Sequence, residues 1–121
     1  MKYLALIYTD ETVWEAMSDG ERLATRDRYL ALGDDMRTAG VFVAGDQLAS
    51  TRDATTVRVQ DVETLVTDGP YAEVKEALGG YYLLECESMD AAQDWAARIP
   101  AAERGAVEVR PLHAEPEGDA A

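Results

Sequence analysis

The residues with the clearest chemical potential lie in one short stretch, DGPYAEVKEALGG, which begins at Asp68. Within it, Tyr71, Glu73, Lys75 and Glu76 are close together in the chain. A carboxylate beside an ammonium group can act as an acid and a base, or can hold an anionic substrate. The same pattern is also common in solvated ion pairs, which contribute less than about 1 kcal/mol. The spacing therefore allows a ligand site without specifying a reaction.

Glycines and a proline flank this charged cluster on both sides. Asp68–Gly69–Pro70 has the composition of a turn, because Asp and Gly tolerate unusual backbone angles and Pro fixes its own φ. These residues could shape the loop alone, or they could also line a site. Gly79–Gly80 lacks the pattern of a phosphate loop and precedes a strand rather than a helix. A bend or a close backbone approach explains that pair better.

Asp10 and Tyr29 are the other candidates for chemistry. Asp10 follows an apolar strand, at an end from which its carboxylate can face a cleft or cap a helix. Tyr29 belongs to a helical stripe that is predicted to face a sheet. Its ring would then pack in the core while its hydroxyl needs a hydrogen-bond partner. Asp10 could be that partner, since the two elements are adjacent in the chain.

The elements that must position these residues follow from the hydrophobic periodicity. One helix is predicted from the capping-box pair Ser18 and Glu21 to Gly40, and a second from Ser88 to Pro100. Strands are predicted at 2–8, 41–45, 55–59, 64–67, 80–87 and 106–112. This order gives two βαβ halves with an inserted hairpin. We therefore expect an α+β, ferredoxin-like fold with an antiparallel sheet and two helices on one face.

The strands at 2–8 and 80–87 are apolar at nearly every position, which is typical of strands covered on both faces. A ferredoxin-like sheet carries its helices on one face only. The mismatch is resolved by a second copy of the chain, with the two sheets packed face to face. We therefore expect a homodimer.

Composition narrows the class of protein. The 121 residues suit a single domain, expected at 1–112, and the unpatterned acidic stretch 113–121 is expected to be a flexible tail. The net charge of −13 argues against nucleic acid and anionic membranes as partners.

The N-terminal apolar run is too short for a secretory signal, so we expect a cytoplasmic protein. Cys86 is predicted to be a thiol buried in the core. The sole histidine, His113, has no other potential metal ligands grouped near it in the sequence. We expect no metal site and no cofactor.

The motif region and its surroundings resemble a known family. DGPYAEVKEALGGYYLLE, MDAAQDWAARIP and VEVRPL, with the opening MKYLALIYTDE, are similar to YCII-related proteins of the DGPF family. Here Tyr71 stands where the signature has Phe. The resemblance runs from Met1 to about Leu112 and implies a dimeric α/β barrel, with the charged loop bordering a cleft between sheet and helix.

The same resemblance implies several functions. In the broader group, relatives of a muconolactone-type dehalogenase use an Asp and a His in the cleft. Asp10 matches the Asp, whereas Tyr29 stands in place of the His, and a phenol is a poor base at neutral pH. One reading is an enzyme acting on a small organic acid or lactone, with Asp10 as base, Tyr29 as hydrogen-bond donor and Lys75 as anchor. The alternatives are a non-catalytic module that binds a small anionic or polar ligand or regulates a protein partner, linked to alternative sigma factors, and a scaffold without a ligand.

Overall fold

A four-stranded antiparallel sheet forms the centre of the molecule, and its first strand in chain order, Lys2–Thr9, is one of the two inner strands. The computed structural model describes residues 1–113. In chain order the elements are β1 (Lys2–Thr9), α1 (Glu11–Ala16), α2 (Asp19–Thr38), β2 (Phe42–Gln47), η1 (Thr51–Asp53), β3 (Thr55–Gln60), β4 (Glu63–Asp68), β5 (Ala77–Glu85), α3 (Met89–Ala97), η2 (Pro100–Glu103) and β6 (Ala106–Pro111). The strand order β2-β5-β1-β6 and the antiparallel pairing are compatible with the expected ferredoxin-like α+β fold.

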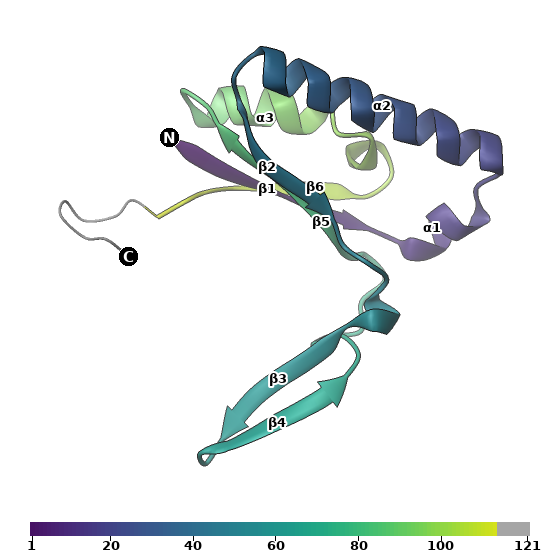
Figure 1. The fold of residues 1–121 in the computed structure, drawn as a ribbon, viewed down its shortest axis with the longest axis vertical. Helices are drawn as coiled ribbons and strands as arrows, with labels where there is room; N and C mark the ends of the chain where they lie inside the picture. Colours follow the sequence, from purple (N-terminus) through teal and green to yellow (C-terminus); the bar gives the residue numbers. More distant parts are fainter. Residues whose placement is uncertain (114–121) are drawn as a thin grey trace.

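The two faces of the sheet have different surroundings. Along β1, Tyr3, Ala5 and Ile7 are buried against the helices, whereas the alternate residues Leu4 and Leu6 are only partly buried. Figure 1 shows α2 and α3 on the same side of the sheet, and in the described part of the chain no element covers the other side of it. The expectation that both long helices cover one face is confirmed. We call the uncovered side the bare face.

The core lies between the sheet and the two long helices. Its largest fully buried side chains are Met36, Leu84 and Ile99. The long helix α2 reaches this core through the expected stripe, in which Leu32 and Met36 are buried. Ser18 and Glu21 form the predicted capping box at its start. At its end, Gly40 has φ +75°, which few other residues adopt without strain.

The inserted hairpin stands apart from this layered body. Strands β3 and β4 pair as the predicted hairpin, with a two-residue turn at Asp61 and Val62, and form a two-stranded sheet of their own. The hairpin projects from the region that connects β2 to β5, away from the helices (Figure 1). Its side chains are exposed at almost every position, because no other element of residues 1–113 covers either side of it.

The short helix α1 was not expected from the sequence. It spans only Glu11–Ala16 and carries no apolar stripe, so periodicity gives no signal for it. Strand β5 also begins earlier than expected, at Ala77. A bulge opposite Ile7 and Tyr8 accommodates Gly79, and a Cβ on Gly80 would lie 3.0 Å from the Asp46 carbonyl oxygen. The close backbone approach expected at the glycine pair is therefore confirmed.

The last strand, β6, ends at Pro111, and the expected domain end at residue 112 stays a prediction. His113 is exposed and is the last residue described. The remainder of the stretch expected to be a flexible tail, 114–121, lies outside the described residues.

We predict that Met36→Ala lowers the free energy of unfolding by about 2–5 kcal/mol, because it leaves a cavity in the fully buried core. Leu30→Ala on the same helix is the matched control. Leu30 is 57% exposed, so its truncation should change stability by less than about 0.5 kcal/mol. Urea denaturation monitored by circular dichroism measures both. Equal effects from the two variants would contradict the assigned core.

Candidate functional site

Two adjoining cavities lie where the end of β1, α1, η1 and the loop before β5 meet. The larger has a volume of about 430 Å³ and the smaller about 260 Å³. The larger is lined by Asp10, Glu11, Thr12, Thr51, Val74, Lys75 and Ala77. The smaller is lined by Thr51, Arg52, Gly69, Pro70, Ala72, Glu73, Val74 and Ala77. Because the two share Thr51, Val74 and Ala77, we describe them together as the loop groove.

Asp10 borders the larger cavity and is also the N-cap of α1. Its Oδ1 accepts hydrogen bonds from the Thr12 backbone N–H (3.0 Å) and from Thr12 Oγ1 (2.6 Å). These bonds lower the pKa of Asp10, with a smaller contribution from the charge of Lys75. Asp10 is therefore ionised at neutral pH, and the capping role that its sequence position suggested is confirmed.

Glu11 joins α1 to the segment that precedes the hairpin. Its carboxylate accepts hydrogen bonds from the Thr51 backbone N–H (2.8 Å), Ser50 Oγ (3.1 Å) and Thr51 Oγ1 (3.3 Å). The bond from the Thr51 backbone contributes most to lowering the pKa of Glu11. This carboxylate bridges segments forty residues apart in the chain, so it fixes one wall of the loop groove.

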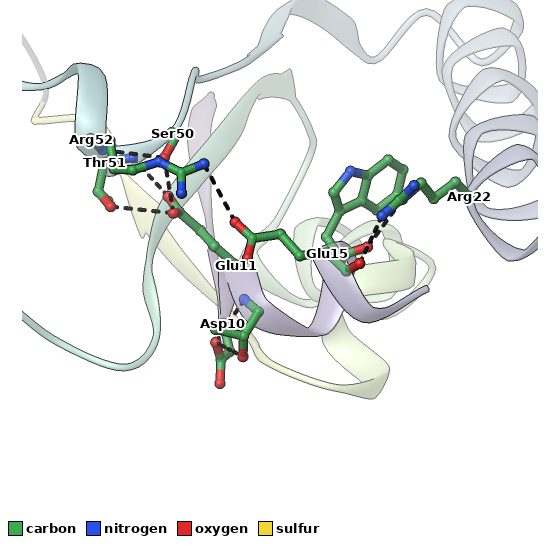
Figure 2. Close-up of polar contacts among 9 residues, drawn as sticks. Asp10, Glu11, Glu15, Arg22, Ser50, Thr51 and Arg52 are labelled. Atoms are coloured by element: carbon green, nitrogen blue, oxygen red, sulfur yellow. Dashed lines mark hydrogen bonds and ion pairs between the residues drawn. The ribbon is translucent and has the colours of Figure 1, made fainter. Parts of the chain in front are cut away.

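Further polar contacts hold α1 in place (Figure 2). The Arg22 guanidinium of α2 donates to the carbonyl oxygens of Trp14 (3.1 Å) and Glu15 (2.8 Å). The Glu15 carboxylate lies 3.5 Å from the Arg52 guanidinium of η1. The short helix is therefore tied on one side to α2 and on the other to η1, which explains why so few residues form a helix here.

The Asp68–Gly69–Pro70 turn joins the hairpin to the groove. Gly69 has φ +102°, its N–H donates to the Ala54 carbonyl oxygen (2.7 Å), and its own carbonyl accepts from Thr56 Oγ1 (2.9 Å). Asp68 pairs with Thr55 as the last residue of β4. The predicted turn is thus observed, and Gly69 and Pro70 line the smaller cavity as well.

The remaining loop candidates divide between the groove and the surface. Lys75 lines the larger cavity and Glu73 the smaller one. Tyr71 is 77% exposed, and the Arg58 guanidinium lies 5.5 Å from its ring centroid in a cation–π contact. Tyr71, Glu76 and Asp68 are not among the residues lining either cavity.

Tyr29 lies on α2 and packs against the hydrophobic core. Burial raises its pKa, and a hydrogen bond with the Ala101 backbone partly offsets this effect. Tyr29 lines neither cavity, and the Asp10 carboxylate is bonded to Thr12 instead. The structure therefore places the two residues that were considered as a catalytic pair in different surroundings.

The loop groove contains residues that the sequence did not single out. Glu11, Thr51 and Arg52 all line it, although they lie far from the charged loop in the chain. Glu11 directly follows Asp10, which was the only signal available for it. Nothing in the spacing of Thr51 and Arg52 could have indicated that they meet the loop.

Residues 1–113 contain no cluster of three or more His, Cys, Asp or Glu side chains placed to hold a metal ion. In the same part of the chain, no helix is both long enough and apolar enough to cross a membrane. The single cysteine, Cys86, is a buried free thiol, as expected. Burial raises its pKa, so it is protonated at neutral pH.

Comparison with known proteins identifies the family. The YCII-related domain model matches residues 1–114, nearly the whole chain. A protein of Rhizobium meliloti (strain 1021), described as "Uncharacterized protein R00369", is 40% identical over 114 residues, which covers 93% of this chain and 92% of the relative. The chain therefore belongs to the YCII-related domain family, and the family resemblance of its motif region is confirmed.

We predict that Glu11→Gln lowers stability at neutral pH by no more than about 1 kcal/mol, because charged hydrogen bonds become neutral ones at a solvent-accessible site. The lowered pKa of Glu11 means that the folded state favours its ionised form. This stabilisation is complete above the pKa of a free glutamate, about 4.3, and is lost as the pH falls through the lower folded-state value.

The two proteins should therefore differ in stability at pH 6–7, and the difference should narrow as the pH falls below about 4.3, as measured by urea denaturation. Glu15→Gln, which removes only one exposed ion pair, is the control and should have a smaller effect. A difference between wild type and Glu11→Gln that persists unchanged at pH 3 would contradict the role assigned to the carboxylate.

Proposed function

We propose that the loop groove binds a small organic acid or lactone, with Lys75 and Arg52 as the cationic anchors. The observation that carries this proposal is the placement of one cation in each of two adjoining cavities. Lys75 shares the larger cavity with Glu11, whose charge is already engaged by hydrogen bonds, and Arg52 shares the smaller one with Glu73. The combined space suits a small molecule rather than a polymer.

The local charges favour an anionic group at Lys75. Among residues 1–113, no carboxylate lies within ion-pair distance of its ammonium group. The nearby Glu11 carboxylate accepts three hydrogen bonds and Asp10 accepts two, so both negative charges have donors of their own. The ammonium group of Lys75 therefore remains available for the carboxylate of a ligand.

Arg52 supplies a second donor group at the other end of the groove. Its guanidinium contacts Glu15 at 3.5 Å but is 77% exposed, so this ion pair is weak and can be exchanged for a ligand. A guanidinium can bind a carboxylate through two parallel hydrogen bonds. A ligand with polar groups at both ends could then contact Lys75 and Arg52 together.

A second candidate function is acid–base catalysis in the same groove, with Asp10 as the base. The shared cavity of Asp10 and Lys75 favours it, because an anchored acid or lactone would lie beside an ionised carboxylate. The lowered pKa makes Asp10 a weaker base, and Tyr29 does not line the groove to donate a hydrogen bond. Ligand binding, with or without a regulatory protein partner such as an alternative sigma factor, is therefore the better supported function.

The proposal includes a homodimer in which two bare faces pack together as a dimeric α/β barrel, in the cytoplasm. The partly buried Leu4, Leu6 and Leu83, which alternate with core residues on β1 and β5, support the dimer. The buried free thiol of Cys86 suits a reducing compartment.

We predict that Lys75→Ala weakens binding of a small carboxylic acid roughly tenfold, because it removes one charged hydrogen bond. Succinate and γ-butyrolactone are suitable probes, titrated into ¹⁵N-labelled protein while amide chemical shifts are followed by NMR. The control is Lys2→Ala, which removes the chain's other lysine, at the start of β1. Equal affinities for all three proteins, or shifts scattered outside 10–12, 51–52 and 69–77, would contradict the proposed site.

Two substitutions at Asp10 distinguish its role as the N-cap of α1 from any role of its negative charge. Asn is as good an N-cap as Asp, so Asp10→Asn should keep the melting temperature near that of wild type, whereas Asp10→Ala should lower it. If Asp10 is a catalytic base, both variants lose turnover of a lactone substrate. If it is only a cap, Asp10→Asn retains ligand binding and any turnover unchanged. Differential scanning fluorimetry measures the melting temperature, the NMR titration measures ligand binding, and the loss of the lactone's own NMR signals over time measures turnover.

A further inference from the structure

The β3–β4 hairpin, residues 55–68, lacks the packing that usually stabilises such an element. We call it the arm. A two-stranded hairpin is at best marginally stable in water unless it packs on another layer. Within the described chain the arm has no covering layer, and every residue of β4 is exposed. The arm therefore needs a surface that one copy of the chain does not supply.

One side of the arm is apolar. The register places Val57 opposite Val66, and Val59 lies two residues further along the same face. The exposed fraction is 60% for Val57, 63% for Val66 and 71% for Val59. The other face carries Arg58 and Leu65. Three neighbouring valines on one side of an exposed ribbon form a surface suited to a partner.

The tip of the arm is strained as well as apolar. Val62 has φ +63° and is 99% exposed. A β-branched residue is a genuine outlier in this conformation, and Asp-Gly is the favoured sequence for such a turn. No contact within residues 1–113 compensates for Val62, since its side chain is almost wholly in solvent. Strain of this kind, with an apolar side chain at the outermost point, favours a contact with another molecule.

The bare face of the sheet is the second uncovered apolar surface. The register places Leu4 opposite Leu83 and Leu6 opposite Tyr81, all on the side away from the helices. The arm projects away from the helices, on the side of the sheet that the bare face occupies (Figure 1). The arm and the bare face thus border the same open region of the molecule.

We propose that the arm clasps a second copy of this chain, whose sheet lies on the bare face. This inference rests on the homodimer proposed above and adds the element that holds it. Each copy has one bare face and one arm, so a two-fold arrangement covers both surfaces in both copies at a fixed ratio. The partner that covers the arm must also be present with every folded molecule, because each chain has the same unsupported arm.

Charge on the bare face also favours a second copy. Lys2 pairs with Glu85 in the sheet, and Arg110 and Glu108 lie opposite Leu4 and Leu6. This face therefore carries both signs of charge, although the chain as a whole has a net charge of −13. A surface of mixed sign can pair with itself about a two-fold axis, whereas a polyanion would require a basic surface.

The test combines oligomeric state with protection of the arm. Analytical ultracentrifugation of wild type should show a dimer, and Val57→Thr with Val59→Thr should raise the dimer dissociation constant about tenfold or more by replacing apolar contacts with polar ones. Leu65→Thr, on the opposite face of the arm, is the control and should leave the dissociation constant unchanged. Circular dichroism serves to check that each variant is folded.

Hydrogen exchange read by mass spectrometry gives an independent measurement. In the dimer, amides of 55–68 should be protected, and the protection should fall when the protein is diluted below its dissociation constant. A dimer whose arm exchanges freely and tolerates the valine substitutions would overturn the arm proposal alone. A wild type that remains a monomer at high concentration would overturn the homodimer as well. Neither result bears on ligand binding in the loop groove, which the NMR titration tests separately.

The turn gives a third readout. Val62→Gly supplies the Asp-Gly turn and relieves the positive-φ strain, so an arm without a partner would become more ordered. If Val62 contacts the second copy, the same substitution weakens the dimer several-fold despite the better turn. A Val62→Gly dimer as tight as wild type would exclude the tip from the interface.

Discussion

The antiparallel pairing of β1 with both β5 and β6 is the constraint on which the rest of the structure depends. It places alternate β1 residues against the helices and the others on the bare face. It also fixes where β1 ends, and so positions Asp10 at the start of α1. Because β5 pairs with the same strand, the loop that precedes it returns to that end of the sheet. The loop groove is a consequence of this pairing.

Local polar contacts then complete the groove. The Glu11 carboxylate joins α1 to the segment before the arm, and Gly69 joins the arm to the backbone of Ala54. Both contacts lie next to the two ends of the arm, where it joins the rest of the chain. The arm and the groove therefore share a short segment of chain, although the arm itself lines neither cavity apart from the turn that follows it. Lys75 lies in the loop between the arm and β5, and it lines the larger cavity.

Much of the fold could be predicted because its signals are local and periodic. The capping box at Ser18, the glycine after α2 and the alternation in β3 each reflect the conformation of a few adjacent residues. The bend at Gly79–Gly80 and the cap at Asp10 were accessible for the same reason. The short helix α1 was missed because tertiary contacts from Arg22 and Thr51, rather than its own sequence pattern, hold it in place.

The candidate site was predictable only in part. Lys75, Glu73 and the turn residues share one short stretch, so their proximity was visible in the sequence. Glu11, Thr51 and Arg52 reach the groove through chain folding over forty residues, which no spacing rule reports. Tyr29 shows the converse. Its ring packs against the core as expected, but the Asp10 carboxylate that could have been its hydrogen-bond partner is bonded to Thr12.

Binding of a small organic acid in the loop groove is the central claim, and a crystal structure after soaking with a mixture of small carboxylic acids and lactones tests it most directly. We expect ligand density in the groove, with a carboxylate or carbonyl oxygen within hydrogen-bond distance of Lys75 or Arg52. A groove filled by the protein's own side chains, or ligand bound only elsewhere on the surface, would contradict the claim.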